Sequence, residues 1–195
     1  GADGVRLADV NHDGLLDITT GWEEGGTVRV YLNPGPAKAR AKWPAVTVGQ
    51  VGSVEDAVFV DLDGDGAIDV VSSCEGKVRT MFVHWAPTDP SKYLAGLSWT
   101  TAALPGSRNA MQWMFCLPLQ VDGKHGIDLV AGGKNQNAAL GWFEAPSNPR
   151  RLADWKWHPL CKAGWIMSLV ASDMDDDGDL DVLFSDRKGQ STGCF

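Results

Sequence analysis

A motif of clustered aspartates repeats along the chain and constrains the fold more than any other feature of the sequence. It reads D-x-[DN]-x-D-G-x-x-D and occurs three times, as "DVNHDGLLD" from Asp9, "DLDGDGAID" from Asp61 and "DMDDDGDLD" from Asp173. A degenerate fourth copy, "QVDGKHGID", begins at Gln120. The copies begin 52, 59 and 53 residues apart, so the chain is built from a repeated unit of about that length.

Other landmarks keep the same phase and indicate four short strands in each unit. A run that ends before proline recurs as "VRVYLNPG", "MFVHWAP" and "LGWFEAP", and a tryptophan precedes or opens the next run at Trp43, Trp99 and Trp157. The runs are rich in β-branched and aromatic residues and are bounded by Gly, Pro, Asp and Asn, which is typical of strands. Such a period predicts an all-β fold, a β-propeller built of four-stranded antiparallel blades, because a β-helix has a shorter period and a sandwich does not repeat in sequence.

We expect a single propeller region over residues 1–195, with blades at about 3–50, 54–106 and 111–161 and an incomplete blade at 165–195. The chain then holds about three and a half blades, whereas a closed ring needs 4–8. Either the region is part of a larger propeller or another chain completes the last blade. We favour the first, because no N-terminal strand is left over to complete that blade.

The acidic motif predicts a metal site in each regular copy. Positions 1, 3 and 5 can converge on one point if glycine at position 6 allows a sharp turn, and position 9 can close the shell. All these ligands are hard oxygens, which suit Ca²⁺ better than Mg²⁺. The predicted ligands are Asp9, Asn11, Asp13, Asp17, Asp61, Asp63, Asp65, Asp69, Asp173, Asp175, Asp177 and Asp181.

Two other structures could begin with this acidic motif. An EF-hand requires Glu at position 12 and flanking helices, but position 12 is Thr20, Ser72 or Phe184 and the flanks are strand-like. A solvated acidic hairpin turn would need no ion, but three copies in register argue against chance. The third copy has Lys124 at position 5, whose ammonium can pair with Asp122 or Asp128 and replace a cation. We therefore expect about three structural calcium ions and none in the third copy, which also accounts for much of the net charge of −8.

With these motifs between strands, the chain resembles the FG-GAP/VCBS repeats that build the propellers of integrin α-subunits, certain fungal lectins and many bacterial surface proteins. The resemblance implies structural calcium between the first two strands of a blade. The degenerate third loop, the incomplete last blade and the scarcity of FG-GAP tripeptides depart from the pattern. Family members include lectins, adhesins, scaffolds and a few enzymes, so the fold does not fix the function. Together with the millimolar calcium found outside cells, the family indicates an extracellular or periplasmic location.

We expect a ligand on the face opposite the acidic loops, because alternating strands bring the other turns together there and binding residues concentrate on loops. Its mixture of aromatic, amide and charged residues suits a glycan or a protein partner. The alternatives are that Trp113 and Trp165 pack between blades and that the charged residues are merely solvated. The candidates are Trp22, Glu23, Glu24, Glu55, Asp56, Glu75, Gln112, Trp113, Lys134, Asn135, Trp165, Asp186, Arg187 and Lys188.

The sequence favours a non-catalytic, calcium-stabilised recognition or scaffold module. The alternatives are a polysaccharide lyase or hydrolase that uses the same face, and a structural subunit of a larger assembly. We predict no catalytic residue, since the ligand face lacks histidine and the chain has no G-x-S-x-G, H-E-x-x-H or phosphate-loop motif. Glu24, Glu55 or Glu75 would have to act as the base in an enzyme.

Charge, hydropathy and cysteine spacing argue against a nucleic-acid-binding protein, a membrane-spanning protein and a zinc protein. The acidic balance argues against a nucleic-acid partner, and no apolar run of about 18 residues predicts a membrane span. The four cysteines have no CxxC spacing, so a zinc site is not expected. Core thiols are the favoured interpretation, with one or two disulfides as the alternative.

Overall fold

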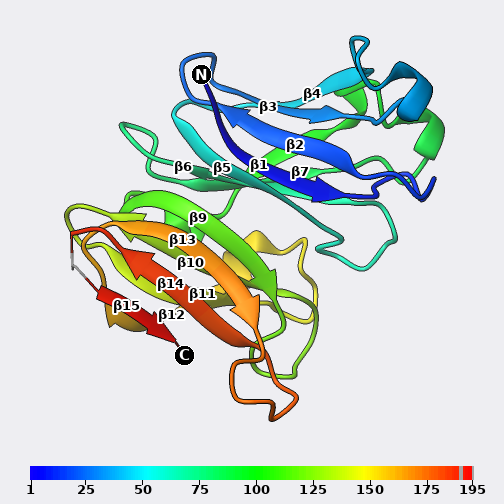
Figure 1. Ribbon diagram of the computed structural model, residues 1–195. Coiled ribbons are helices and arrows are strands. Elements are labelled where there is room, and N and C mark those ends of the chain that lie inside the picture. Colours follow the sequence, from blue (N-terminus) through cyan, green and yellow to red (C-terminus); the bar gives the residue numbers. More distant parts are fainter. Residues whose placement is uncertain (189–190, 195) are drawn as a thin grey trace.

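The computed structural model describes residues 1–188 and 191–194 and is built of antiparallel sheets (Figure 1). Strands and five short 3₁₀ helices are the regular elements of this part of the chain, which confirms the all-β prediction. Within it, no helix is long and apolar enough to cross a membrane.

The first two sheets each have four strands in chain order. Sheet one comprises β1 (Ala2–Ala8), β2 (Asp17–Trp22), β3 (Thr27–Tyr31) and β4 (Ala45–Gln50). Sheet two comprises β5 (Val54–Val60), β6 (Asp69–Cys74), β7 (Met81–Trp85) and β8 (Thr100–Ala103). The 3₁₀ helices η1 (Pro36–Lys38), η2 (Pro90–Lys92) and η3 (Gly96–Ser98) lie between the third and fourth strands.

The other two sheets continue the same order, with three strands of the fourth sheet in the described part of the chain. Sheet three comprises β9 (Gln112–Leu119), β10 (Asp128–Lys134), β11 (Ala139–Glu144) and β12 (Lys156–Lys162). Sheet four comprises β13 (Ile166–Ser172), β14 (Asp181–Asp186) and β15 (Ser191–Cys194), and the expected blade end at residue 195 lies outside the described residues. Helix η4 (Pro105–Ser107) precedes β9, and η5 (Leu152–Asp154) precedes β12.

The four sheets share one register at the acidic turn. In each sheet, the aspartate at position 9 opens the second strand and pairs with the last residue of the first strand. The pairs are Ala8 with Asp17, Val60 with Asp69, Leu119 with Asp128 and Ser172 with Asp181. The repeated sequence therefore builds a repeated hairpin.

Neighbouring sheets pack through alternating apolar side chains. The first strands contact one another in the series β1, β5, β9 and β13. One cluster, which includes Val28 and Val54, fills the space between sheets one and two, and a second, centred on Trp113 and Phe143, lies between sheets two and three. A third cluster joins Leu140 to Ile166 between sheets three and four. Side chains alternate across a strand, so each inner sheet serves two cores.

The outward faces of the first and fourth sheets expose apolar side chains. Val5 and Leu7 on β1 are 56% and 57% exposed, and Met167 and Val170 on β13 are 41% and 53% exposed. Strand alternation turns these residues away from the inner sheets, with a register shift between Ile166 and Ser168 that brings Met167 to the same face as Val170. Both end faces thus present the kind of surface that is buried between the inner sheets.

Three of the four cysteines are free thiols in the structure. Cys74 and Cys116 are buried free thiols, and Cys161 is a half-buried free thiol, which agrees with the favoured interpretation for these three.

A buried histidine links sheets one and two. The His84 ring contacts the Ser72 hydroxyl through Nε2 at 2.9 Å and the Thr101 hydroxyl through Nδ1 at 2.8 Å. A side chain at Gly49 would collide with this ring, so glycine permits the close approach. Burial lowers the pKa of His84 from 6.5 to about 3, so the ring stays neutral in the fold.

We predict that His84 makes the fold sensitive to acid. The folded-state pKa lies below the unfolded value, so the stability it contributes is present above pH 6.5 and is lost as the pH falls toward 3. Relative to His84→Gln, the wild type should lose about 1.4 kcal/mol of unfolding free energy per pH unit below pH 6. Urea denaturation at several pH values measures this difference, and buried carboxylates cancel because both proteins contain them. Parallel pH profiles would contradict the prediction.

Candidate functional site

Four turns with one backbone conformation form the candidate metal region. We name them loop one (residues 9–17), loop two (61–69), loop three (120–128) and loop four (173–181). In each loop, positions 4 and 6 have the positive φ that glycine adopts most easily. Position 4 is His12, Gly64, Gly123 or Asp176, and position 6 is Gly14, Gly66, His125 or Gly178. Loop three thus keeps the turn although its sequence is degenerate.

The aspartate at position 9 ties loops one, two and three to their sheets. The two Asp69 carboxylate oxygens accept hydrogen bonds from the Leu62 N–H at 3.2 Å and from the Ala86 N–H at 2.7 Å, beyond β7. Asp17 and Asp128 bond in the same way, and both are fully buried. Burial raises the pKa of Asp69 to about 7, against the lowering effect of its backbone donors.

The carboxylates at positions 3 and 5 use one oxygen on the turn and leave the other for a cation. In loop two, Asp63 Oδ1 accepts from the Asp65 N–H at 3.2 Å, and Asp65 Oδ1 accepts from the Ala67 N–H at 2.9 Å. The second oxygens of both residues bind the Arg150 guanidinium, which reaches across from sheet three; the Arg150–Asp65 pair measures 3.1 Å. Arg150 also lies 4.6 Å from the centroid of the Trp85 ring.

Loop four has the same arrangement and an unsatisfied oxygen. Oxygens of Asp173, Asp175 and Asp181 lie within 4.8 Å of one another, as do those of Asp61, Asp63 and Asp69 in loop two. Asp173 Oδ2 accepts from the Gly178 N–H, but Asp173 Oδ1 is buried and lacks a hydrogen-bond partner among the described residues. A buried acceptor of this kind is costly unless a donor or a cation meets it. The donor set therefore fits a hard divalent cation.

In loop three, the side-chain nitrogens of Gln120 and Lys124 contact oxygens that would face a cation in the other loops. Lys124 Nζ pairs with Asp122 Oδ2 at 2.8 Å, one of the two partners expected from the sequence. The Gln120 amide accepts from the Asp122 and Gly123 N–H groups and donates through Nε2 to the carbonyls of Lys124 and Gly126. Gly126 is position 7, whose carbonyl would complete a cation shell. In the sequence, the feature that points to this role of Gln120 is its place at position 1 of the motif, where the other loops have aspartate.

Among the predicted ligand positions, loop one differs from loops two and four only at position 3, which is Asn11. Asn11 Nδ2 donates to Asp13 Oδ2 at 3.0 Å, while Asp9 accepts from the Asp13 and Gly14 N–H groups. The amide oxygen of an asparagine can replace a carboxylate oxygen in a calcium site. Loop one therefore offers the same ligand types as loops two and four.

On the opposite face, three glutamates and a lysine come together from three sheets. Glu23, Glu55 and Glu75 place carboxylate oxygens within 4.8 Å of one another. Lys134 Nζ pairs with Glu55 at 3.1 Å and with Glu75. Burial, followed by the hydrogen bond to Glu75, raises the pKa of Glu55 to about 7.

Sheet four adds an aromatic ring with cations around it. Trp165 lies 4.7 Å from Lys134 Nζ, 5.2 Å from Arg187 Cζ and 5.0 Å from Lys188 Nζ, measured to the ring centroid. Asn135 Oδ1 accepts from Lys188 Nζ at 2.6 Å. The structure thus gathers several of the residues that sequence analysis assigned to the ligand face.

Other members of the predicted ligand set are structural. Trp113 is fully buried, donates from Nε1 to the Ser107 carbonyl and packs against Phe143, so it is a core residue, as the alternative interpretation held. Asp56 is fully buried and pairs with Arg6 at 2.9 Å, so it too cannot contact a ligand at the surface. Asp186 is buried and bonds to backbone N–H groups.

The remaining predicted ligand residues lie near the same turns. Glu24 is exposed in the turn between β2 and β3, while Trp22 is half-buried. Gln112 is half-buried at the start of β9, where it pairs in the sheet with Lys134.

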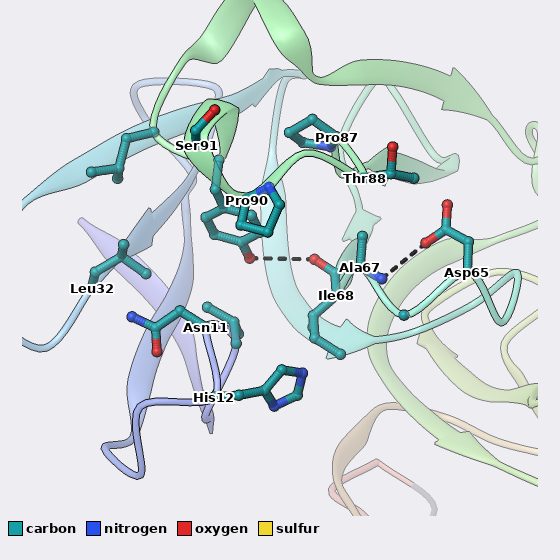
Figure 2. Close-up of a pocket in the computed structure, with 14 residues that line it drawn as sticks. Asn11, His12, Leu32, Asp65, Ala67, Ile68, Pro87, Thr88, Pro90 and Ser91 are labelled. Atoms are coloured by element: carbon teal, nitrogen blue, oxygen red, sulfur yellow. Dashed lines mark hydrogen bonds between the residues drawn. The ribbon is translucent and has the colours of Figure 1, made fainter.

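A cavity that the sequence did not reveal lies between loops one and two. Its volume is about 380 Å³, and Figure 2 shows His12 and Asp65 from these loops facing the segment around Pro87 and Pro90. Tyr93 fixes this wall by donating its hydroxyl to the Ile68 carbonyl at 3.3 Å. The run "APTDPSKYL" holds two prolines but no motif that indicates a cavity.

Comparison with known proteins matches part of the chain to a repeat family. Residues 9–72, which span loops one and two, match the family model described as the FG-GAP-like repeat. None of the curated proteins compared with the chain matches it.

We predict that the position-9 aspartate stabilises the fold independently of any metal. Asp128→Asn in loop three replaces one acceptor oxygen with an N–H₂ group that faces a backbone donor, and should cost about 1–3 kcal/mol of unfolding free energy. Urea denaturation in a chelator measures this loss. Asp154→Asn, a control at the surface beside Arg151, should change the stability little. An unaltered urea midpoint for Asp128→Asn would contradict the anchoring role.

Proposed function

We propose that this chain, whose residues 9–72 match the FG-GAP-like repeat, is a calcium-stabilised propeller module that serves recognition or scaffolding. The observation that carries the proposal is the convergence of carboxylate oxygens in loops two and four, together with the same backbone turn in loop one. The resident ion would hold a hairpin shut and take no part in chemistry. A rigid scaffold of this kind leaves the opposite turns free to bind a glycan or protein partner.

The propeller assignment rests on how the sheets pack. Successive first strands contact one another, and each sheet is a meander of antiparallel strands, as in propeller blades. The apolar end faces at Val5, Leu7, Met167 and Val170 would be covered by further blades of a longer propeller or by another chain.

The calcium assignment rests on the oxygen chemistry. Asp9, Asn11, Asp13 and Asp17 would hold an ion in loop one, and the equivalent residues would do so in loops two and four. Flexible all-oxygen sites of this size suit Ca²⁺. Loop three would hold none, because the nitrogens of Gln120 and Lys124 already meet its oxygens.

We further propose an extracellular or periplasmic location, because calcium is abundant there and would saturate sites of modest affinity. The net charge of −8 supports a partner other than nucleic acid.

Calcium should raise the melting temperature, and a chelator should lower it by many degrees. An ion that binds only the folded state at 100 times its dissociation constant adds about 2.7 kcal/mol per site. Asp175→Ala in loop four should abolish roughly a third of the calcium-dependent shift, if the three sites contribute equally. Asp122→Ala, at the same position in loop three, should leave that shift unchanged. A melting temperature insensitive to calcium would refute the proposal.

Removal of Arg150 should tighten calcium binding at loop two. The guanidinium binds two of the proposed ligands and repels an incoming cation, so Arg150→Gln should lower the dissociation constant of this site on the order of tenfold. Arg151→Gln is the matched control, since Arg151 pairs with Asp154 instead. Calorimetric titration with Ca²⁺ measures both variants, and weaker binding in Arg150→Gln would show that the guanidinium supports the ion.

A further inference from the structure

Three cationic side chains surround one indole ring on the face opposite the loops. Lys134, Arg187 and Lys188 each lie within 5.2 Å of the Trp165 ring centroid. The negative face of the ring attracts each cation, but like charges gathered so closely repel one another. Carboxylates or a bound anion would offset this repulsion.

The backbone around the ring is fixed by a buried carboxylate. Asp186 accepts from the N–H groups of Gly164 and Trp165, both at 2.7 Å, and from that of Lys188 at 3.1 Å. Arg187 N–H in turn donates to the Trp165 carbonyl. The segments that carry the ring and the two exposed cations are therefore held together at the end of β14.

The positive charge is balanced on one side of the ring only. Lys134 is paired with Glu55 and Glu75. Within residues 1–188 and 191–194, no carboxylate forms an ion pair with Arg187 or Lys188, and Lys188 donates to the neutral Asn135 amide. Both side chains are exposed, so two cations and an amide face solvent beside an acidic cluster.

We infer that this surface binds an acidic oligosaccharide, with its carboxylate or sulfate group between Arg187 and Lys188 and its hydroxyl groups toward Glu55 and Glu75. The inference rests on the proposed recognition role of this face and names the ligand class. Arginine binds planar anions through two parallel hydrogen bonds, and lysine adds a point charge. Carboxylates accept hydrogen bonds from sugar hydroxyls.

The mixture of charges favours a sugar over other anions. A nucleic acid or a polyglutamate segment carries dense negative charge, which the glutamate cluster next to Lys134 would repel. An acidic oligosaccharide spaces its anionic groups with neutral hydroxyls, so each part of the ligand meets a side chain of suitable charge. A neutral oligosaccharide would leave Arg187 and Lys188 without the anion that they are placed to bind.

Calorimetric titration at low ionic strength tests the inference with four probes: a trigalacturonate, a sulfated carrageenan oligosaccharide, maltotriose and pentaglutamate. The trigalacturonate, the sulfated oligosaccharide or both should bind, and the pair shows whether carboxylate or sulfate is preferred. Binding should weaken as salt rises. Arg187→Gln and Lys188→Gln should each weaken it on the order of tenfold, whereas Lys38→Gln, an exposed cation in η1, should leave it unchanged.

Several results would overturn the inference. They are the absence of binding by either acidic sugar, equal binding of maltotriose or pentaglutamate, and acidic-sugar binding that is insensitive to both variants. The calcium-dependent melting shift, measured on the same samples, separates the two proposals. If that shift persists without sugar binding, only the ligand assignment fails; if it is absent, the calcium-stabilised module fails.

Discussion

The structure depends on one bond pattern, in which a buried aspartate opens the second strand of a sheet and accepts from two separate backbone segments. In loop two, Asp69 joins the start of the acidic turn to the residue that follows β7. One side chain therefore sets the register of the hairpin and the position of the next strand end. Loop three keeps this aspartate, and the same turn, where positions 1, 5 and 6 have changed. The anchor is thus separable from the charge that surrounds it.

The loops differ in what meets that surrounding charge. In loop three, Gln120 and Lys124 supply nitrogen donors from within the turn. In loop two, Arg150 supplies a guanidinium from the neighbouring sheet. In loop four, Asp173 Oδ1 remains buried without a partner among the described residues. Because carboxylates at this spacing repel one another, the common requirement is a positive group, and an ion is the simplest one where the chain provides none.

Sequence predicted what is local and periodic. The repeated motif located the hairpins, the strand order within each sheet and the Lys124–Asp122 pair, since all of these join residues close in the chain. It could not predict Arg150 at loop two, because that contact joins residues 85 and 87 positions apart and depends on how two sheets pack. It also could not settle Trp113, since a tryptophan that opens an inner strand is compatible with either a surface or a core. The cavity at Pro87 and Pro90 arises only when three segments meet.

At both ends of the sheets, a buried aspartate accepts hydrogen bonds from backbone N–H groups. At the loop end, a buried aspartate accepts from backbone N–H groups and leaves neighbouring carboxylates facing a common point. At the other end of β14, Asp186 accepts from three backbone N–H groups and leaves Arg187 and Lys188 facing solvent. A carboxylate that accepts several backbone N–H groups fixes the backbone of its neighbours, because such charge-assisted hydrogen bonds are short and strong. The same kind of bond thus orders the acidic turns at one end of the sheets and the segments that carry Trp165, Arg187 and Lys188 at the other.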